Sequence, residues 1–93
     1  YLLTSLIGRE LAHKYNDKVV IVVFEVINGP KFIYVRSFKY DLSVPLTKLK
    51  ELGFNVGGKK EVFSIQLNTN EDINSPLSNV VSILRKYLLN NKF

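Results

Sequence analysis

Apolar and polar residues follow two periods along this chain, one typical of helices and one typical of strands. Apolar side chains recur at four-residue intervals over residues 2–15, which predicts an amphipathic helix. Gly8 within that helix weakens it, which indicates close packing against a neighbouring element. Residues 19–27 are almost continuously apolar and predict a central strand buried on both faces. Residues 31–38 alternate, and an Asn-Gly-Pro turn joins them to the first strand as an antiparallel hairpin.

A short helix, a loop and a third strand follow this hairpin. Ser43 is the candidate N-cap of the helix, Pro45 lies in its first turn, and Gly53 is placed to end it. Residues 54–60 contain a pair of glycines followed by a pair of lysines, which predicts a loop. Residues 61–68 alternate and predict a strand with three large apolar side chains facing inward: Phe63, Ile65 and Leu67.

The end of the chain predicts a last helix and completes the fold class. Ser75 and Pro76 are its expected cap and first residue. An apolar stripe follows at helical spacing: Leu77, Val80, Val81, Leu84 and Leu88. The order α-β-β-α-β-α predicts an α/β fold in which helices cover a small mixed sheet of at least three strands. A length of 93 residues predicts a single domain over residues 1–93.

Charge and composition narrow the range of partners. Thirteen Lys and Arg against eight Asp and Glu give a net charge of +5, which favours anionic partners such as nucleic acid. The absence of cysteine excludes disulfides and cysteine-bound zinc, and it is compatible with the reducing cytoplasm, where we expect the protein. The longest apolar run is far shorter than the roughly 20 residues that span a bilayer, so we expect no membrane partner.

Catalytic and metal-binding patterns are absent from the sequence. Its single histidine, His13, is interpreted as a surface residue of the first helix rather than a general base. No HxH, DxD or HExxH pattern occurs, and the Gly-Gly-Lys-Lys segment lacks the first glycine and the Ser or Thr of a Walker loop. The sequence therefore predicts no enzyme, no metal site and no cofactor.

Several segments follow one another in an order known from one family. Residues 7–15 carry Gly and Leu-Ala before Tyr in the opening helix, and residues 19–24 form the buried strand after it. Arg36-Ser37 ends the second strand, and residues 57–65 carry the Gly-Gly segment. This arrangement resembles the DHH-associated domain, the C-terminal partner domain of RecJ-type nucleases and related phosphoesterases, over nearly the whole chain.

The resemblance implies an anion-binding site without catalysis. In active relatives, the arginine and a Gly-Gly-His segment grip a substrate phosphate beside the metal ions. Here Lys59 stands in place of the histidine, and the DHH catalytic domain is missing from the chain. A lysine can still hold a phosphate as a point charge. The implied site consists of six residues: Arg36, Ser37, Gly57, Gly58, Lys59 and Lys60.

Three functions are compatible with this resemblance. The first is a non-catalytic module that binds single-stranded DNA or RNA during replication or repair. The second is a scaffold like the archaeal RecJ-like proteins that associate with GINS, in which the phosphate site has decayed and the partners are GINS and replicative helicase subunits. The third is the C-terminal piece of a complete phosphoesterase. A basic groove through Arg36 and Lys59 favours the first, and an exposed apolar patch favours the second.

Each candidate residue also has a purely structural interpretation. Arg36 would lie over aromatic neighbours on its strand. Gly57-Gly58 would form a flexible loop, and Lys59-Lys60 a solvated turn. Three aromatic residues near Arg36 are expected in the core or at its rim rather than stacked on bases: Tyr34, Phe38 and Tyr40.

Overall fold

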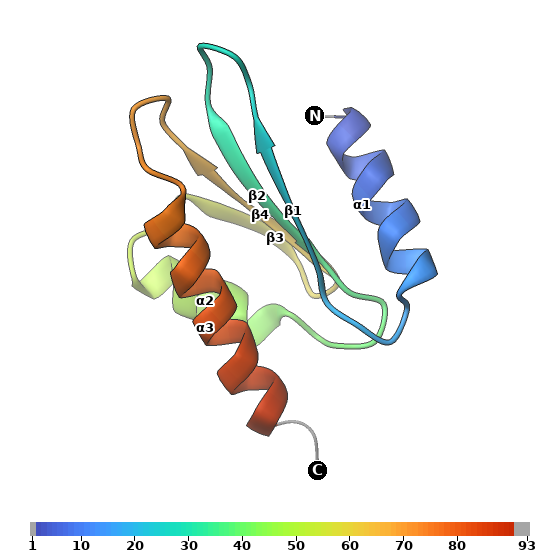
Figure 1. Cartoon of the computed structure of the whole chain (residues 1–93). Helices are drawn as coiled ribbons and strands as arrows, with labels where there is room; N and C mark the ends of the chain where they lie inside the picture. Colours follow the sequence, from blue (N-terminus) through green and yellow to red (C-terminus); the bar gives the residue numbers. More distant parts are fainter. Residues whose placement is uncertain (1, 91–93) are drawn as a thin grey trace.

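A four-stranded antiparallel sheet forms the middle layer of the molecule, with helices on both of its faces (Figure 1). The computed structural model describes residues 2–90, with side chains described from Leu6 onward. In chain order its elements are α1 (Leu2–Lys14), β1 (Val20–Glu25), β2 (Lys31–Arg36), α2 (Ser43–Glu51), β3 (Val56–Lys59), β4 (Val62–Leu67) and α3 (Asn74–Asn90). The strand order is β1-β2-β4-β3, so β2 and β4 are central and β1 and β3 are the edges.

The predicted fold class, the β1–β2 hairpin and the helical covering are confirmed, but two details of the sheet differ. A fourth strand, β3, occupies Val56–Lys59, where the sequence predicts a loop. The element order is therefore α-β-β-α-β-β-α. The sheet is antiparallel throughout rather than mixed, because β3 and β4 form a second hairpin and β4 runs antiparallel to β2.

Gly58 explains why the sequence predicts a loop where the structure has the strand β3. A Cβ atom at Gly58 would lie 2.5 Å from the Phe63 Cα and 2.7 Å from the Phe63 Cβ. Gly58 also has φ +157°, a conformation that other residues rarely adopt. The pair of glycines, which suggests a loop by composition, instead lets β3 approach β4 closely.

The predicted central position of the first strand is wrong. β1 lies at an edge, and β2 takes the centre between β1 and β4. Val20, Ile21 and Val22 are half-buried, whereas Val23 is 42% exposed. An unbroken apolar run cannot distinguish the two positions, because helix α1 covers one face of this edge strand and requires apolar residues there as well.

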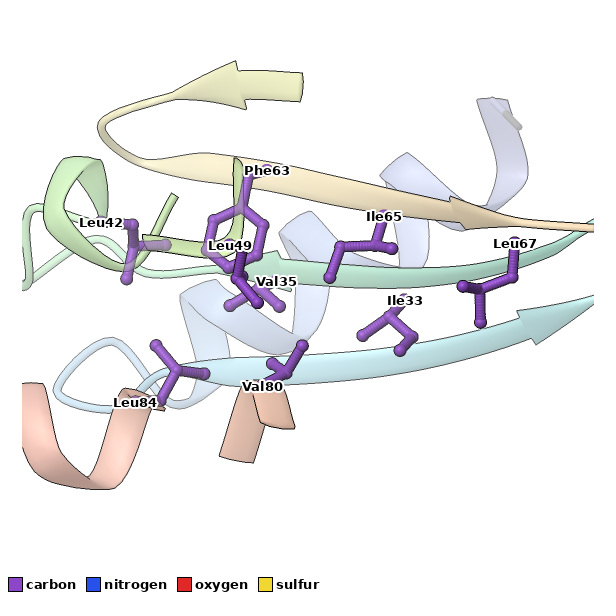
Figure 2. Close-up of a cluster of buried hydrophobic side chains, with 9 residues drawn as sticks. All are labelled: Ile33, Val35, Leu42, Leu49, Phe63, Ile65, Leu67, Val80 and Leu84. Carbon is purple, nitrogen blue, oxygen red and sulfur yellow. The ribbon is translucent and has the colours of Figure 1, made fainter. Parts of the chain in front are cut away.

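The main core fills the space between the sheet and helices α2 and α3 (Figure 2). Strands β2 and β4, the residue before α2, and the two helices contribute nine buried side chains: Ile33, Val35, Leu42, Leu49, Phe63, Ile65, Leu67, Val80 and Leu84. The inward alternation of β4 is thus confirmed. The predicted stripe of α3 is also confirmed, since Val80 and Leu84 are buried and its other members are half-buried.

Helix α1 packs through small residues, which corrects its predicted apolar stripe. Gly8 and Ala12 are buried, whereas Leu6 and Ile7 are 50% and 43% exposed. The close neighbour expected from Gly8 is the ring of Tyr34, whose Cδ1 would lie 2.7 Å from a Cβ at this position. Only a face of small residues lets the helix lie this close to the ring, so the larger apolar side chains turn outward.

The two later helices begin earlier than predicted, α2 by one residue and α3 by two. The N-cap of α2 is Leu42 rather than Ser43, and the Asp41 Oδ1 accepts the Ser43 backbone N–H at 2.9 Å. Helix α3 starts at Asn74, where the Asp72 carboxylate accepts the Asn74 N–H at 3.1 Å. The predicted role of Gly53 is confirmed by its φ of +91° directly after the C-cap of α2.

The two glycines of β3 offer a matched test of this packing. We expect Gly58→Ala to lower the free energy of unfolding by about 1–3 kcal/mol, because its Cβ would collide with the β4 backbone. Gly57→Ala is the control, since nothing lies within 4 Å of a Cβ there. Urea denaturation of both variants measures the difference. Equal stability of the two variants would contradict the close approach of β3 to β4.

Candidate anion-binding site

Two basic residues of the predicted site lie in one row across the sheet. Arg36 in β2 is paired with Val62 in β4, and Val62 is in turn paired with Lys59 in β3. Directly paired residues of antiparallel strands project from the same face, so Arg36 and Lys59 share a face and flank Val62. Two strand spacings separate their backbones by about 10 Å. The structure thus brings together the arginine and the first lysine of the predicted site.

Arg36 is a half-buried cation without a counter-ion among the described residues. Its Nη1 donates a hydrogen bond to the Tyr34 hydroxyl at 2.8 Å, and its guanidinium lies 5.2 Å from the centroid of the Phe38 ring. Its Nε is buried and has no hydrogen-bond partner among the described residues. No carboxylate of the described residues forms an ion pair with the Arg36 guanidinium. A partly buried charge of this kind is stabilised by a bound anion.

Helix α1 supports the arginine through an aromatic contact that the sequence analysis missed. The rings of His13 and Phe38 lie with centroids 4.6 Å apart and planes tilted by 33°. His13 is exposed, as predicted, and its ring holds Phe38 next to the Arg36 guanidinium. No sequence pattern links these residues, because the contact depends on where the end of α1 falls over the loop after β2.

Ser37 shapes the loop after Arg36. Its side chain is buried, and its hydroxyl oxygen accepts the backbone N–H groups of Lys39 at 3.1 Å and Tyr40 at 3.0 Å. Its own N–H donates to the Glu61 carbonyl at 3.0 Å. These bonds tie the end of β2 to the turn between β3 and β4, so Ser37 positions the loop that carries Phe38.

The two glycines of the predicted site have different surroundings. Gly57 is paired with Ser64 and therefore belongs to the Arg36 face, where it is exposed with open space above it. Gly58 is paired with Phe63 and belongs to the opposite face, where its backbone lies against β4. Gly57 thus leaves room for a ligand beside the Arg36–Val62–Lys59 row, and Gly58 supports the strand.

Lys60 lies outside the Arg36–Val62–Lys59 row, in the turn between β3 and β4. Its carbonyl accepts the Leu42 N–H at 2.6 Å, and it helps to line a hollow of about 470 Å³ with residues 37–41 and Glu61. A side-chain hydrogen bond with Ser43 is the largest influence that holds the pKa of Asp41 below its usual value, and the Lys60 charge acts in the same direction. The Lys60 charge is therefore partly offset by Asp41, unlike that of Arg36.

The three aromatic residues near the site have different degrees of burial. Tyr34 is 7% exposed, which confirms its core position beneath α1. Phe38 is 44% exposed at the rim, between His13 and Arg36. Tyr40 is half-buried, with the Lys39 ammonium 5.5 Å from its ring centroid.

Residues 2–90 contain neither a metal-binding cluster nor a membrane-spanning helix. Within them, no group of three or more His, Cys, Asp or Glu side chains is placed to hold a metal ion. No helix of residues 2–90 has the length and apolar character needed to cross a bilayer.

No family model matches the sequence, and no curated protein shows a significant match to it. The resemblance to the DHH-associated domain therefore stays a prediction.

The lowered pKa of Asp41 predicts a pH dependence of stability. Because the folded-state pKa lies below the usual 3.8, the unfolded chain binds the proton more readily. The stabilising contribution is therefore complete above the unfolded-state value and is lost as pH falls through the folded-state value. We expect Asp41→Asn to be less stable than wild type at neutral pH, and the difference to shrink in acid. Urea denaturation across this range measures it, and a difference independent of pH would contradict the assignment.

Proposed function

We propose that this domain binds single-stranded nucleic acid, DNA or RNA, without catalysing a reaction on it. The nucleic-acid backbone lies along the face that carries the Arg36–Val62–Lys59 row. The observation that carries the proposal is the half-buried Arg36 guanidinium. Among the described residues, its Nε has no hydrogen-bond partner and no carboxylate balances its charge. A phosphate diester provides the oxygen atoms and the negative charge that this group lacks.

The shape of this face supports a single strand as the ligand. Helix α1 packs over β1 and β2, so the β3–β4 half of the same face stays open beside it. That half displays exposed Gly57, Lys59 and Gln66, together with half-buried Ser64. The row from Arg36 to Lys59 spans two strand spacings, about 10 Å, which suits one phosphodiester chain. Ser64 and Gln66 offer hydroxyl and amide groups to sugars and base edges.

The net charge and the resemblance support the same conclusion. A charge of +5 attracts polyanions over several ångströms at physiological salt. RecJ-like proteins act on single-stranded DNA, so we place this domain in DNA replication or repair.

A second candidate function is a scaffold in the replication machinery, with GINS and replicative helicase subunits as partners. Exposed apolar side chains on α1, in β1 and in the turn after it favour this function: Leu6, Ile7, Val23, Val26 and Ile27. These residues lie away from the Arg36–Val62–Lys59 row, so the two functions are compatible within one molecule.

Fluorescence anisotropy with a labelled single-stranded oligonucleotide tests the first function. We expect Lys59→Ala to weaken binding by about 1 kcal/mol, roughly five-fold, and to lower the slope of log K against log salt by about 1. We expect Arg36→Ala to weaken binding by about 1–3 kcal/mol, since it also loses hydrogen bonds to phosphate. Lys50→Ala is the matched control, because Lys50 is exposed on α2 across the sheet from this face.

Two results would contradict the proposal. One is the absence of binding at low salt, and the other is equal binding by wild type and both site variants. Arg36→Lys separates charge from geometry, because lysine keeps the charge but not the planar group that reaches Tyr34. Thermal unfolding of each variant confirms that lost binding does not reflect lost folding.

A further inference from the structure

The outer edge of β1 presents main-chain groups without partners in the sheet. β1 pairs with β2 alone, and the Val26 N–H donates to the Pro30 carbonyl at 3.1 Å. Inward and outward bonding alternate along an antiparallel strand, so the even-numbered residues of β1 bond toward β2. The N–H and C=O groups of Ile21, Val23 and Glu25 therefore point away from the sheet.

The two edges of the sheet differ in how they resist pairing with another strand. β3 has four residues, of which two are glycine and one is lysine, features that discourage pairing. β1 has six residues, VIVVFE, without lysine, proline or glycine, and its only charge stands at the end. Unprotected apolar edges of this kind are templates for another strand. The main-chain groups require an extended strand as the occupant, and the side chains require an apolar one.

We propose that β1 pairs with β1 of a second copy of this chain in an antiparallel ladder, with the two-fold axis at Val22. This two-fold axis is perpendicular to the sheet, so the α1-covered faces of both copies lie on the same side. Each even-numbered residue of β1 then lies opposite an even-numbered residue of the other copy. Val22 then lies opposite itself, Val20 opposite Phe24, and Ile21 opposite Val23, whose outward main-chain groups exchange hydrogen bonds. β-Branched and aromatic pairs of this kind stabilise a sheet.

The charges at the ends of β1 favour this register. With the axis at Val22, Glu25 lies opposite Val19 of the other copy. The two Glu25 side chains are about 20 Å apart along the ladder, so they do not repel appreciably. The junction therefore has an apolar centre and brings no like charges together.

Helix α1 provides a second reason to choose a copy of this chain as the occupant. The helix packs over both β1 and β2, so its axis lies about half a strand spacing inside the edge. The two-fold axis places the two α1 helices on the same face with axes about 10 Å apart, a normal packing distance for helices. Helix α1 carries exposed apolar side chains in the single chain, among them Leu6 and Ile7, so a second helix beside it can bury apolar surface.

Cysteine cross-linking tests the register directly, because the chain has no cysteine of its own. In the proposed dimer the two Val22 Cα atoms are about 4.5 Å apart, within disulfide range, whereas the two Val20 Cα atoms are about 13 Å apart. Mild oxidation should therefore cross-link Val22→Cys at least ten-fold faster than Val20→Cys, with the rate rising with protein concentration. Equal rates in the two variants, or no cross-linking in either, would overturn the proposal.

Sedimentation equilibrium of the 93-residue chain provides an independent test without cysteine. We expect a monomer–dimer equilibrium that is lost in Val23→Lys, which places two lysines about 7 Å apart at the junction. Leu52→Lys is the matched control, because Leu52 is 60% exposed at the end of α2 and carries the same change. Higher salt should strengthen the dimer, whose copies each carry +5, but weaken nucleic-acid binding. A wild type that stays monomeric at all concentrations would overturn the dimer and leave the proposed function standing.

Discussion

The contact between Gly8 and the ring of Tyr34 supports both helix α1 and the candidate site. The ring occupies space that any larger residue at position 8 would fill, which sets the distance between α1 and the sheet. The Tyr34 hydroxyl then accepts the hydrogen bond from Arg36, and the end of α1 brings His13 against Phe38 beside the same guanidinium. A change in how α1 docks would therefore move the groups that orient Arg36.

The two faces of the sheet have different roles, one in stability and the other in the candidate site. One face is covered by α2 and α3 and contains the main apolar core, which supplies most of the burial that stabilises the fold (Figure 2). The other face is covered by α1 over β1 and β2 only, so β3 and β4 are left to present polar groups and Lys59. Gly58 links the two faces, because its missing side chain lets β3 approach β4 and place Lys59 in the same row as Arg36.

Sequence patterns predicted those elements whose apolar residues recur at the period of a strand or helix and are also the residues that are buried. The alternation of β4 and the stripe of α3 are of this kind, since each buries a regular set of apolar residues. The buried face of α1 could not be predicted, because close packing selected Gly8 and Ala12 over larger apolar residues. β3 was missed because glycine pairs are typical of loops, and its role depends on the distance to β4, which no local pattern records. Arg36 and Lys59 were named from the resemblance, but only the strand register places them on one face.

The most direct test of this account is an NMR titration that follows the Nε–H signals of the arginine side chains as a short single-stranded oligonucleotide is added. The chain has three arginines, so Arg9 and Arg85 serve as internal controls for Arg36. We predict that the Arg36 Nε–H signal shifts in a saturable manner, because a phosphate bound to the guanidinium changes its surroundings. The Arg9 and Arg85 signals should change little. Equal shifts at all three arginines, or none at Arg36, would contradict the claim that Arg36 is the centre of the site.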